Sequence, residues 1–147
     1  MFKFLKEEID NREKSAERIA YLEQKYGITF PDILRQLYAK TDSNSKMHLC
    51  VFEIDGFKFE VWQLVPLDWG KFNFEFIADD DRDERFEGMF NDWYPLTYDR
   101  GDATYYWNSK THKICFVIDG MIEESANICN SIEEFIELLD NSIVEEK

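Results

Sequence analysis

The 147-residue sequence has few cations for its size. Lys and Arg number 17 against 31 Asp and Glu, which gives a formal net charge of −14 at pH 7. Such a chain repels nucleic-acid phosphates and attracts basic surfaces. The excess is regional, because residues 75–102 hold 10 acids and 3 bases, and residues 119–147 hold 9 acids and 1 base. We therefore expect no nucleic-acid binding, and any protein partner should present a basic surface.

Cysteine, histidine and glycine are also scarce. The three cysteines, Cys50, Cys115 and Cys129, have no C-x-x-C spacing, which favours reduced, buried thiols. The two histidines, His48 and His112, do not stand in a metal-ligand spacing, and the 6 glycines form no phosphate-binding loop. The motifs G-x-S-x-G and H-E-x-x-H are absent. The sequence thus predicts no catalytic residue, no cofactor and no metal site.

Long apolar runs are missing as well. No run approaches 18 residues, and the first ten positions alternate charged and apolar residues, so we expect no membrane span, no signal peptide and a cytoplasmic protein. What the chain has in quantity is apolar surface: 44% of its residues are hydrophobic and 16% aromatic, too much for a disordered acidic chain. Its length suits one core, and we predict a single domain over residues 1–147.

Hydrophobic periodicity predicts the order of elements. A helix is expected from Glu8 to Tyr26, stopped by Gly27, and a second one opens at Pro31 in "PDILRQLYAKT". The period then changes to two in "MHLCVFEIDGFKFEVWQLVPL", which predicts a hairpin around Asp55-Gly56. Later strands are expected in "ATYYWN" and "HKICFVIDG". The order ends with a helix in "SIEEFIELL", opened by a capping box, and the fold class is α+β.

The stretch "NFEFIADDDRDERFEGMFNDW" has a mixed pattern. Its apolar start resembles a strand, the acids that follow indicate a loop, and the aromatic residues after them fit an irregular turn over the core. A calcium loop starting at Asp79 would need Gly in its sixth position and an acid in its twelfth, where Glu84 and Phe90 stand. The acids are therefore either a solvated loop or a contact surface for a basic partner.

The triplet Arg100-Gly101-Asp102 looks like an adhesion signal, but nothing in the sequence directs secretion. A loop-to-strand corner is physically sufficient. Gly101 permits a sharp turn, and Asp102 can accept hydrogen bonds from nearby backbone N–H groups. We expect this corner to feed the aromatic run Tyr105 to Trp107 into the sheet.

Three segments share a further pattern: "LEQKYGITFPDILRQLYAKTDSN" near the start, "WYPLTYDRGDATYYWNSKTHKICFVIDG" around the corner, and "SIEEFIELL" near the end. Through these motifs the sequence resembles, from about residue 20 to 140, the SUKH superfamily, which includes fungal cell-wall-synthesis regulators and bacterial immunity proteins. Phe30, Ile33 and "TDSN" depart from the usual family pattern, which has Leu, an aromatic residue and "NGG" there. The motif residues expected to support the fold are Pro95, Gly101, Asp102, Tyr105 and Tyr106.

The resemblance implies a mixed or antiparallel sheet of about six strands, flanked by two N-terminal helices and a C-terminal helix. It also implies binding of other proteins in place of catalysis, because bacterial members typically neutralise a cognate toxin, often a nuclease or deaminase. The leading hypothesis is therefore an immunity protein that blocks a basic toxin. A regulatory scaffold domain is the alternative, and a carboxylate-based metal-dependent hydrolase is less favoured. The candidate contacts are Asp79, Asp80, Asp81, Asp83, Glu84, Trp69 and Phe72, each of which could also be a solvated acid or a core aromatic residue.

Overall fold

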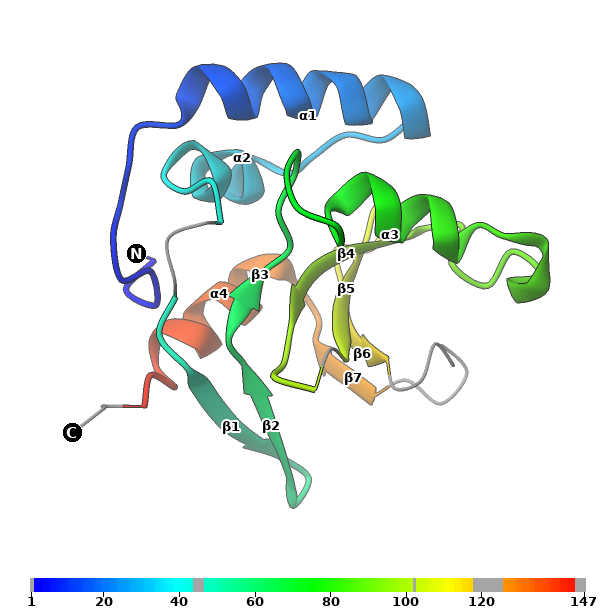
Figure 1. Ribbon diagram of the computed structural model, residues 1–147. Helices are drawn as coiled ribbons and strands as arrows, with labels where there is room; N and C mark the ends of the chain where they lie inside the picture. Colours follow the sequence, from blue (N-terminus) through cyan, green and yellow to red (C-terminus); the bar gives the residue numbers. More distant parts are fainter. Residues whose placement is uncertain (1, 44–46, 102, 118–125, 145–147) are drawn as a thin grey trace.

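The computed structural model describes residues 2–43, 47–101, 103–117 and 126–144. Within these residues, four α-helices and seven strands form one α+β fold (Figure 1). In chain order the elements are α1 Arg12–Tyr26, α2 Asp32–Ala39, β1 Cys50–Ile54, β2 Phe57–Val61, β3 Gln63–Leu64, α3 Phe74–Asp81, the short 3₁₀ helix η1 Glu84–Phe86, β4 Trp93–Tyr98, β5 Thr104–Asn108, β6 Ile114–Val117, β7 Ala126–Cys129 and α4 Ile132–Asp140.

The first helix ends, and the second begins, close to where the sequence predicts. Gly27 closes α1 in the left-handed conformation at φ 66°, and its N–H donates to the carbonyl of Glu23. The helix starts at Arg12, later than the expected Glu8. Pro31 stands one position before α2, in the extended N-cap conformation. The two helices pack against each other above the strands (Figure 1).

The strands form two antiparallel sheets in the described part of the chain. β1 and β2 make a hairpin whose turn residues, Asp55 and Gly56, both have positive φ, at 52° and 82°, as the sequence predicts. The other five strands form a meander in the order β3-β4-β5-β6-β7. The predicted α+β architecture with helices at both ends is confirmed, and the predicted sheet of about six strands is divided into these two sheets.

The side chains of β5 alternate between two apolar clusters on the two faces of the large sheet. Tyr105 and Trp107 enter the main core, where Trp107 lies edge-on to Phe30 at 5.4 Å and Tyr105 lies 5.7 Å from Phe135 of α4, measured between ring centroids. Tyr106 enters a second, smaller cluster, formed with Phe90, Cys115 and Val117. Phe86, Met89 and Trp93 pack around this cluster. The irregular turn expected over the core is therefore confirmed.

Local hydrogen bonds define the remaining corners. The first half of the predicted capping box of α4 is confirmed, because the N–H of Glu134 donates to Oγ of the N-cap residue Ser131 at 3.1 Å. The Glu134 carboxylate accepts at 3.4 Å from the N–H of Asn130, one residue before the cap, so the second half departs from the usual pattern. At the corner before β5, Asp99 Oδ1 accepts from the N–H groups of Gly101 and Ala103, at 2.8 and 3.0 Å. Asp99 thus ties the turn.

The sequence predicts that Gly101 and Asp102 form this corner. Asp102, which the sequence suggested as the tying residue, lies outside the described residues. Gly101 does not have the positive φ that would require glycine, and a Cβ built there would lie 3.5 Å from Asp99 Oδ1, an ordinary contact. The sharp turn expected from Gly101 is therefore a property of the Asp99 hydrogen bonds.

The segment 74–81 corrects the sequence interpretation. It is the helix α3, and the expected strand followed by an acidic loop is wrong. Asn73 is the N-cap, and its side chain accepts from the N–H of Phe76 at 2.9 Å. The alternation of Phe and polar residues that imitated a strand is accommodated because α3 contacts different parts of the protein on each of its faces.

Candidate partner-binding surface

Residues four apart in α3 form rows along the helix, and each row meets a different environment. Phe74 and Ala78 are fully buried in the main core. Ile77 lies next to both clusters, and Asp81, one turn further along, points to Tyr106 in the second cluster. These two rows face inward and fix the helix on the sheet. The acids of the sequence run are therefore divided among the faces of one helix.

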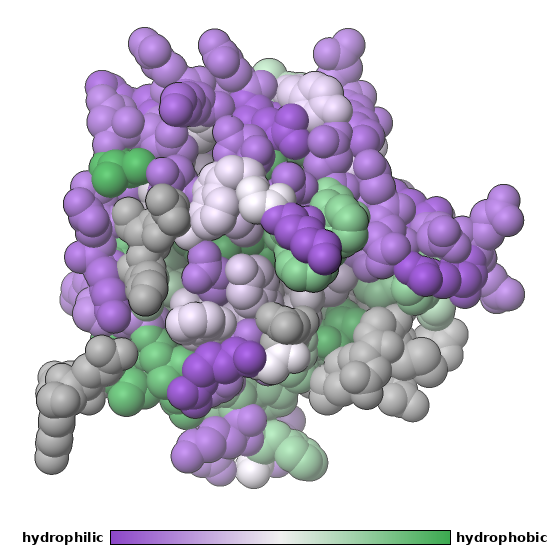
Figure 2. All heavy atoms as spheres, in the orientation of Figure 1, coloured by the Kyte–Doolittle hydropathy of each residue, from purple (hydrophilic) through white to green (hydrophobic). Residues whose placement is uncertain are grey.

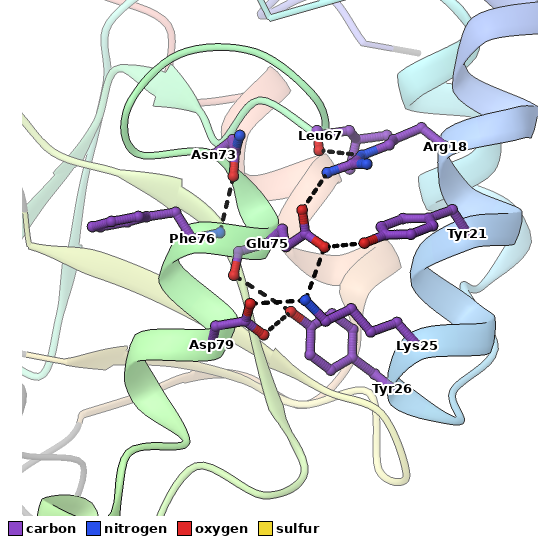
Figure 3. A network of polar contacts seen from close by, with 9 residues as sticks. All are labelled: Arg18, Tyr21, Lys25, Tyr26, Leu67, Asn73, Glu75, Phe76 and Asp79. Atoms are coloured by element: carbon purple, nitrogen blue, oxygen red, sulfur yellow. Dashed lines mark hydrogen bonds and ion pairs between the residues drawn. The ribbon is translucent and has the colours of Figure 1, made fainter.

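The third row, Glu75 and Asp79, faces α1 (Figure 3). Glu75 accepts at 3.1 Å from Arg18 and at 2.8 Å from Lys25, and it also accepts from the Tyr21 hydroxyl. These donors, with Lys25 first and Tyr21 second, lower the pKa of Glu75 to about 2. Glu75 is thus a hub that ties α3 to three side chains of α1.

Asp79 extends the same contact to the end of α1. Its carboxylate accepts from Lys25 at 2.8 Å and from the Tyr26 hydroxyl at 2.6 Å. Lys25 therefore lies between two carboxylates, and the hydrogen bonds that it donates to Asp79 and then to Glu75 raise its pKa above its usual value. Asp79, one of the candidate contacts, is already engaged within the protein. We call the contact of Glu75 and Asp79 with α1 the α1–α3 clamp.

The clamp gives a testable stability prediction. Replacing Glu75 by Gln should lower the free energy of unfolding at pH 7 by roughly 1–2 kcal/mol, because partly exposed charge-assisted hydrogen bonds are lost. The folded-state pKa of Glu75 lies below its usual 4.5, so its contribution is present above that pH and is lost as the pH falls toward about 2. Urea unfolding at several pH values measures this. The difference in the free energy of unfolding between the original protein and Glu75→Gln should disappear in acid.

A matched control for Glu75→Gln is Asp10→Asn. Asp10 forms an ion pair with Arg12 at 2.9 Å, but both side chains are largely exposed. We expect no measurable change in unfolding from this variant, because water screens exposed pairs. Equal effects of the two substitutions would contradict the assignment of Glu75 as a hub.

Asp81 is buried, with 7% of its surface exposed. Its Oδ2 accepts from the Tyr106 hydroxyl at 2.6 Å. Burial raises the pKa of Asp81 to about 6, and the hydrogen bond from Tyr106 opposes this rise. In the described structure this carboxylate is an internal partner of the sheet and is not presented to a docking protein.

The other three acids of the run are on the surface. Asp80 lies 2.6 Å from Arg85, and Asp83 caps η1 by accepting from the N–H of Arg85 at 3.0 Å. Glu84 is exposed in the first turn of η1. The surface part of the acidic run is thus Asp80, Asp83 and Glu84, with Arg85 among them.

The two aromatic candidates lie in the loop before α3. Trp69 is partly exposed, and its indole N–H donates to the carbonyl of Asp42. Phe72 is 56% exposed, and its ring lies edge-on at 5.6 Å from that of Phe76, which is 48% exposed. Figure 2 shows side chains of intermediate to apolar hydropathy, drawn pale and green, below the hydrophilic ones over α1. Neither aromatic candidate is a core residue.

A pocket of about 180 Å³ opens beside the two Phe rings, and its lining residues are Phe72, Ile77, Tyr98 and Thr104. Tyr98 of β4 and Thr104 of β5 are paired in register. Sequence reasoning found Phe72 and missed Phe76, Ile77, Tyr98 and Thr104. The signal for Phe76 and Ile77 was Asn73, a strong N-cap residue, which places both in the first turn of a helix. No local signal points to Tyr98 or Thr104.

Three of the family-motif residues, Pro95, Tyr105 and Tyr106, lie in strands of the large sheet. Pro95 lies in β4 opposite Tyr106, and the register of the ladder shifts between Pro95 and Thr97. The Tyr105 hydroxyl donates at 2.7 Å to the carbonyl of Glu60 in β2, so it links the two sheets. Burial raises the pKa values of both Tyr105 and Tyr106 above their usual range. Both phenols remain neutral donors.

The described residues contain no group of three or more His, Cys, Asp or Glu side chains placed to hold a metal ion. The three cysteines are buried, and they form no disulfide bond with one another. Burial raises the pKa of Cys50 to about 12 and that of Cys129 to about 11, which disfavours the reactive thiolate. Within the same residues, no helix combines the length and the apolar character needed to cross a membrane.

An antiparallel meander with two helices before it and one after it defines an α+β domain of the kind that the sequence motifs suggested. The SMI1 / KNR4 family (SUKH-1) matches this chain over residues 14–138, from the first turn of α1 to the last turn of α4. The chain therefore belongs to this family. No curated protein matches the chain.

Proposed function

We propose that this chain is a non-catalytic, immunity-type domain that binds a basic toxin protein and blocks its active site. The observation that carries the proposal is membership of the SUKH-1 family, which is consistent with an immunity-type protein. The net charge of −14 supports it, because a toxin that acts on nucleic acid needs a basic cleft. An acidic protein is attracted to such a cleft and competes there with phosphate.

Co-purification tests the proposal. The chain and the product of the gene next to its own should form a complex when both are folded, and the chain should abolish the toxicity of that product in cells. No complex at micromolar concentration, with both proteins folded, would contradict the immunity function for that pair. A complex with an endogenous regulatory protein in its place would favour the scaffold alternative.

The surface acids give a narrower prediction for the complex. Replacing Asp80 and Asp83 by Asn and Glu84 by Gln should slow association about tenfold at low salt, because exposed charges steer the encounter. The salt dependence of the association rate should flatten. Stopped-flow association at several salt concentrations measures both. Asp79 and Asp81 are left intact, because their internal hydrogen bonds would confuse a loss of binding with a loss of stability.

The control removes the same charge elsewhere. Glu13 and Glu17 of α1 and Glu53 of β1 are exposed, and replacing all three by Gln changes the net charge equally. This control should slow association much less. If both triple variants behave alike, only the overall charge acts. If neither has an effect, the acidic surface around Asp80 is not the interface, and the acids of residues 119–147 become the next candidates.

A further inference from the structure

The pocket beside α3 combines open apolar surface with a defined shape. Phe72 and Phe76 expose about half of each side chain, and the pocket floor is formed by Ile77 with the paired residues Tyr98 and Thr104. Exposed aromatic rings at a pocket edge are typical of binding hot spots. The α1–α3 clamp holds the helix and the β4–β5 ladder holds the floor, so this surface is anchored from two sides. A surface that is held in place before binding loses less entropy when a partner binds.

The size of the pocket restricts what can fill it. Its volume of about 180 Å³ is below the range of roughly 300–1,000 Å³ that is usual for small-molecule and cofactor sites. A space of roughly 150 Å³ is enough for a single benzene ring. The pocket therefore suits one side chain of another protein, either aromatic or branched aliphatic.

The charges around the pocket indicate what kind of protein would supply this side chain. Asp80 is one turn beyond Phe76 in α3, so the two share the outward-facing row. Asp80 contacts Arg85, but a carboxylate has room for further donors. Lys71 is the cation beside the rings, with its Nζ 5.6 Å from the Phe72 ring centroid. A second copy of this chain would bring another charge of −14, so repulsion disfavours self-association.

We propose that the pocket lined by Phe72, Ile77, Tyr98 and Thr104 receives one aromatic or branched aliphatic side chain of a basic partner protein. A Lys or Arg close to it in the same segment contacts Asp80. The apolar side chain supplies the anchor, and the cation fixes the orientation. The identity of the partner as a toxin rests on the proposed function, whereas the chemistry of the contact rests on the pocket and on the charges around it.

Two defined peptides test the pocket without the partner. The probe is the blocked peptide KKGFGKK, and the reference is KKGAGKK, added to isotope-labelled full-length protein while the backbone amide NMR spectrum is followed. We expect shift changes centred on Phe72, Ile77 and Thr104, with the Phe peptide binding about tenfold more tightly than the Ala peptide because one ring is buried. Equal binding of both peptides, or shifts centred elsewhere, would overturn the proposal.

Variants distinguish binding in the pocket from nonspecific binding elsewhere on the surface. Thr104→Trp fills the pocket, and Phe72→Ala removes one wall, so each should abolish the preference for the Phe peptide. The matched control is Phe57→Ala, because Phe57 is 70% exposed beside the β1–β2 turn and does not line the pocket. It should leave the preference unchanged. Loss of the preference in this control alone would place the contact on the hairpin and overturn the proposal.

The complex gives a second readout. Phe72→Ala combined with Phe76→Ala should weaken binding of the neighbouring gene product at least about tenfold, mainly through faster dissociation. If the complex forms and this double variant binds as tightly as the original chain, the pocket proposal fails and the immunity function stands. If the peptides select the pocket but no complex forms with that product, the immunity function fails for the pair and the pocket proposal stands.

The oligomeric state, measured by sedimentation, should be a monomer at neutral pH. A dimer that is lost on Phe72→Ala would instead assign the surface to a second copy and overturn the proposal.

Discussion

Replacing Trp107 by Ala should lower the free energy of unfolding by about 3–5 kcal/mol. Trp107 lies in β5, one residue before its end, and is fully buried. Its ring is 5.4 Å from that of Phe30 before α2 and 5.7 Å from that of Tyr94 in β4. Truncation removes the contacts that join the N-terminal helices to the sheet and leaves a cavity that the surrounding rings cannot fill by small movements.

Urea unfolding at pH 7, followed by far-ultraviolet circular dichroism, measures this loss. Trp62→Ala is the matched control, because Trp62 follows β2 and is 36% exposed. Trp62→Ala should lower the free energy of unfolding far less than Trp107→Ala. Trp107→Phe keeps a ring in the core and should fall between the two. A loss for Trp107→Ala no larger than that for Trp62→Ala would show that the aromatic cluster around β5 does not hold the two parts of the fold together.

Much of the fold follows from local sequence because several segments have one exposed and one buried face. The hairpin at Asp55-Gly56 and the helix that Ser131 caps are of this kind. Their periodicity agrees with their turn and cap residues, so the sequence has only one consistent interpretation there. Tyr105 and Tyr106 also enter the sheet as the sequence predicts, and the structure places them on its opposite faces.

Helix α3 was not predictable in the same way. It has apolar or tightly bonded residues on three faces, so its pattern has no single polar side and imitates an alternating strand. Where each acid goes depends on residues far along the chain. Asp79 is neutralised by Lys25, which comes 54 residues earlier, and Asp81 is bonded by Tyr106, which comes 25 residues later. A run of acids in sequence thus contains both structural and surface carboxylates.

The distribution of side chains over the faces of α3 connects the fold to the candidate site. The α1–α3 clamp and the inward rows determine which side of α3 remains outside, and that side carries Phe76 and Asp80. The exposed row is held in a fixed position by the buried ones. Variants of the clamp are therefore expected to affect partner binding indirectly, whereas variants of the pocket act on it directly.

Replacing Tyr106 by Phe should lower the free energy of unfolding by about 2–3 kcal/mol at pH 8, because it leaves the buried Asp81 carboxylate without its donor. The effect should depend on pH. The folded-state pKa of Asp81, about 6, lies above its usual 3.8, so protonation of Asp81 favours the folded state, and this contribution is lost as the pH rises through about 6. The hydrogen bond from the Tyr106 hydroxyl lowers the pKa of Asp81. Loss of this hydroxyl therefore raises the pKa of Asp81 further and makes its charged form still more costly to bury. The gap between the variant and the original protein should therefore widen from about 1 kcal/mol at pH 5 to its full value at pH 8.

The neighbouring residue supplies the control for this pH dependence. Tyr105 is as deeply buried as Tyr106, but its hydroxyl donates to the backbone carbonyl of Glu60, which does not titrate. Tyr105→Phe should cost about 1 kcal/mol at pH 5 and at pH 8 alike. In the background of Asp81→Asn, where no carboxylate remains to be charged, Tyr106→Phe should also lose its dependence on pH. A gap for Tyr106→Phe that stays constant from pH 5 to pH 8 in the original protein would contradict the assignment of Asp81 as a buried carboxylate that depends on this hydroxyl.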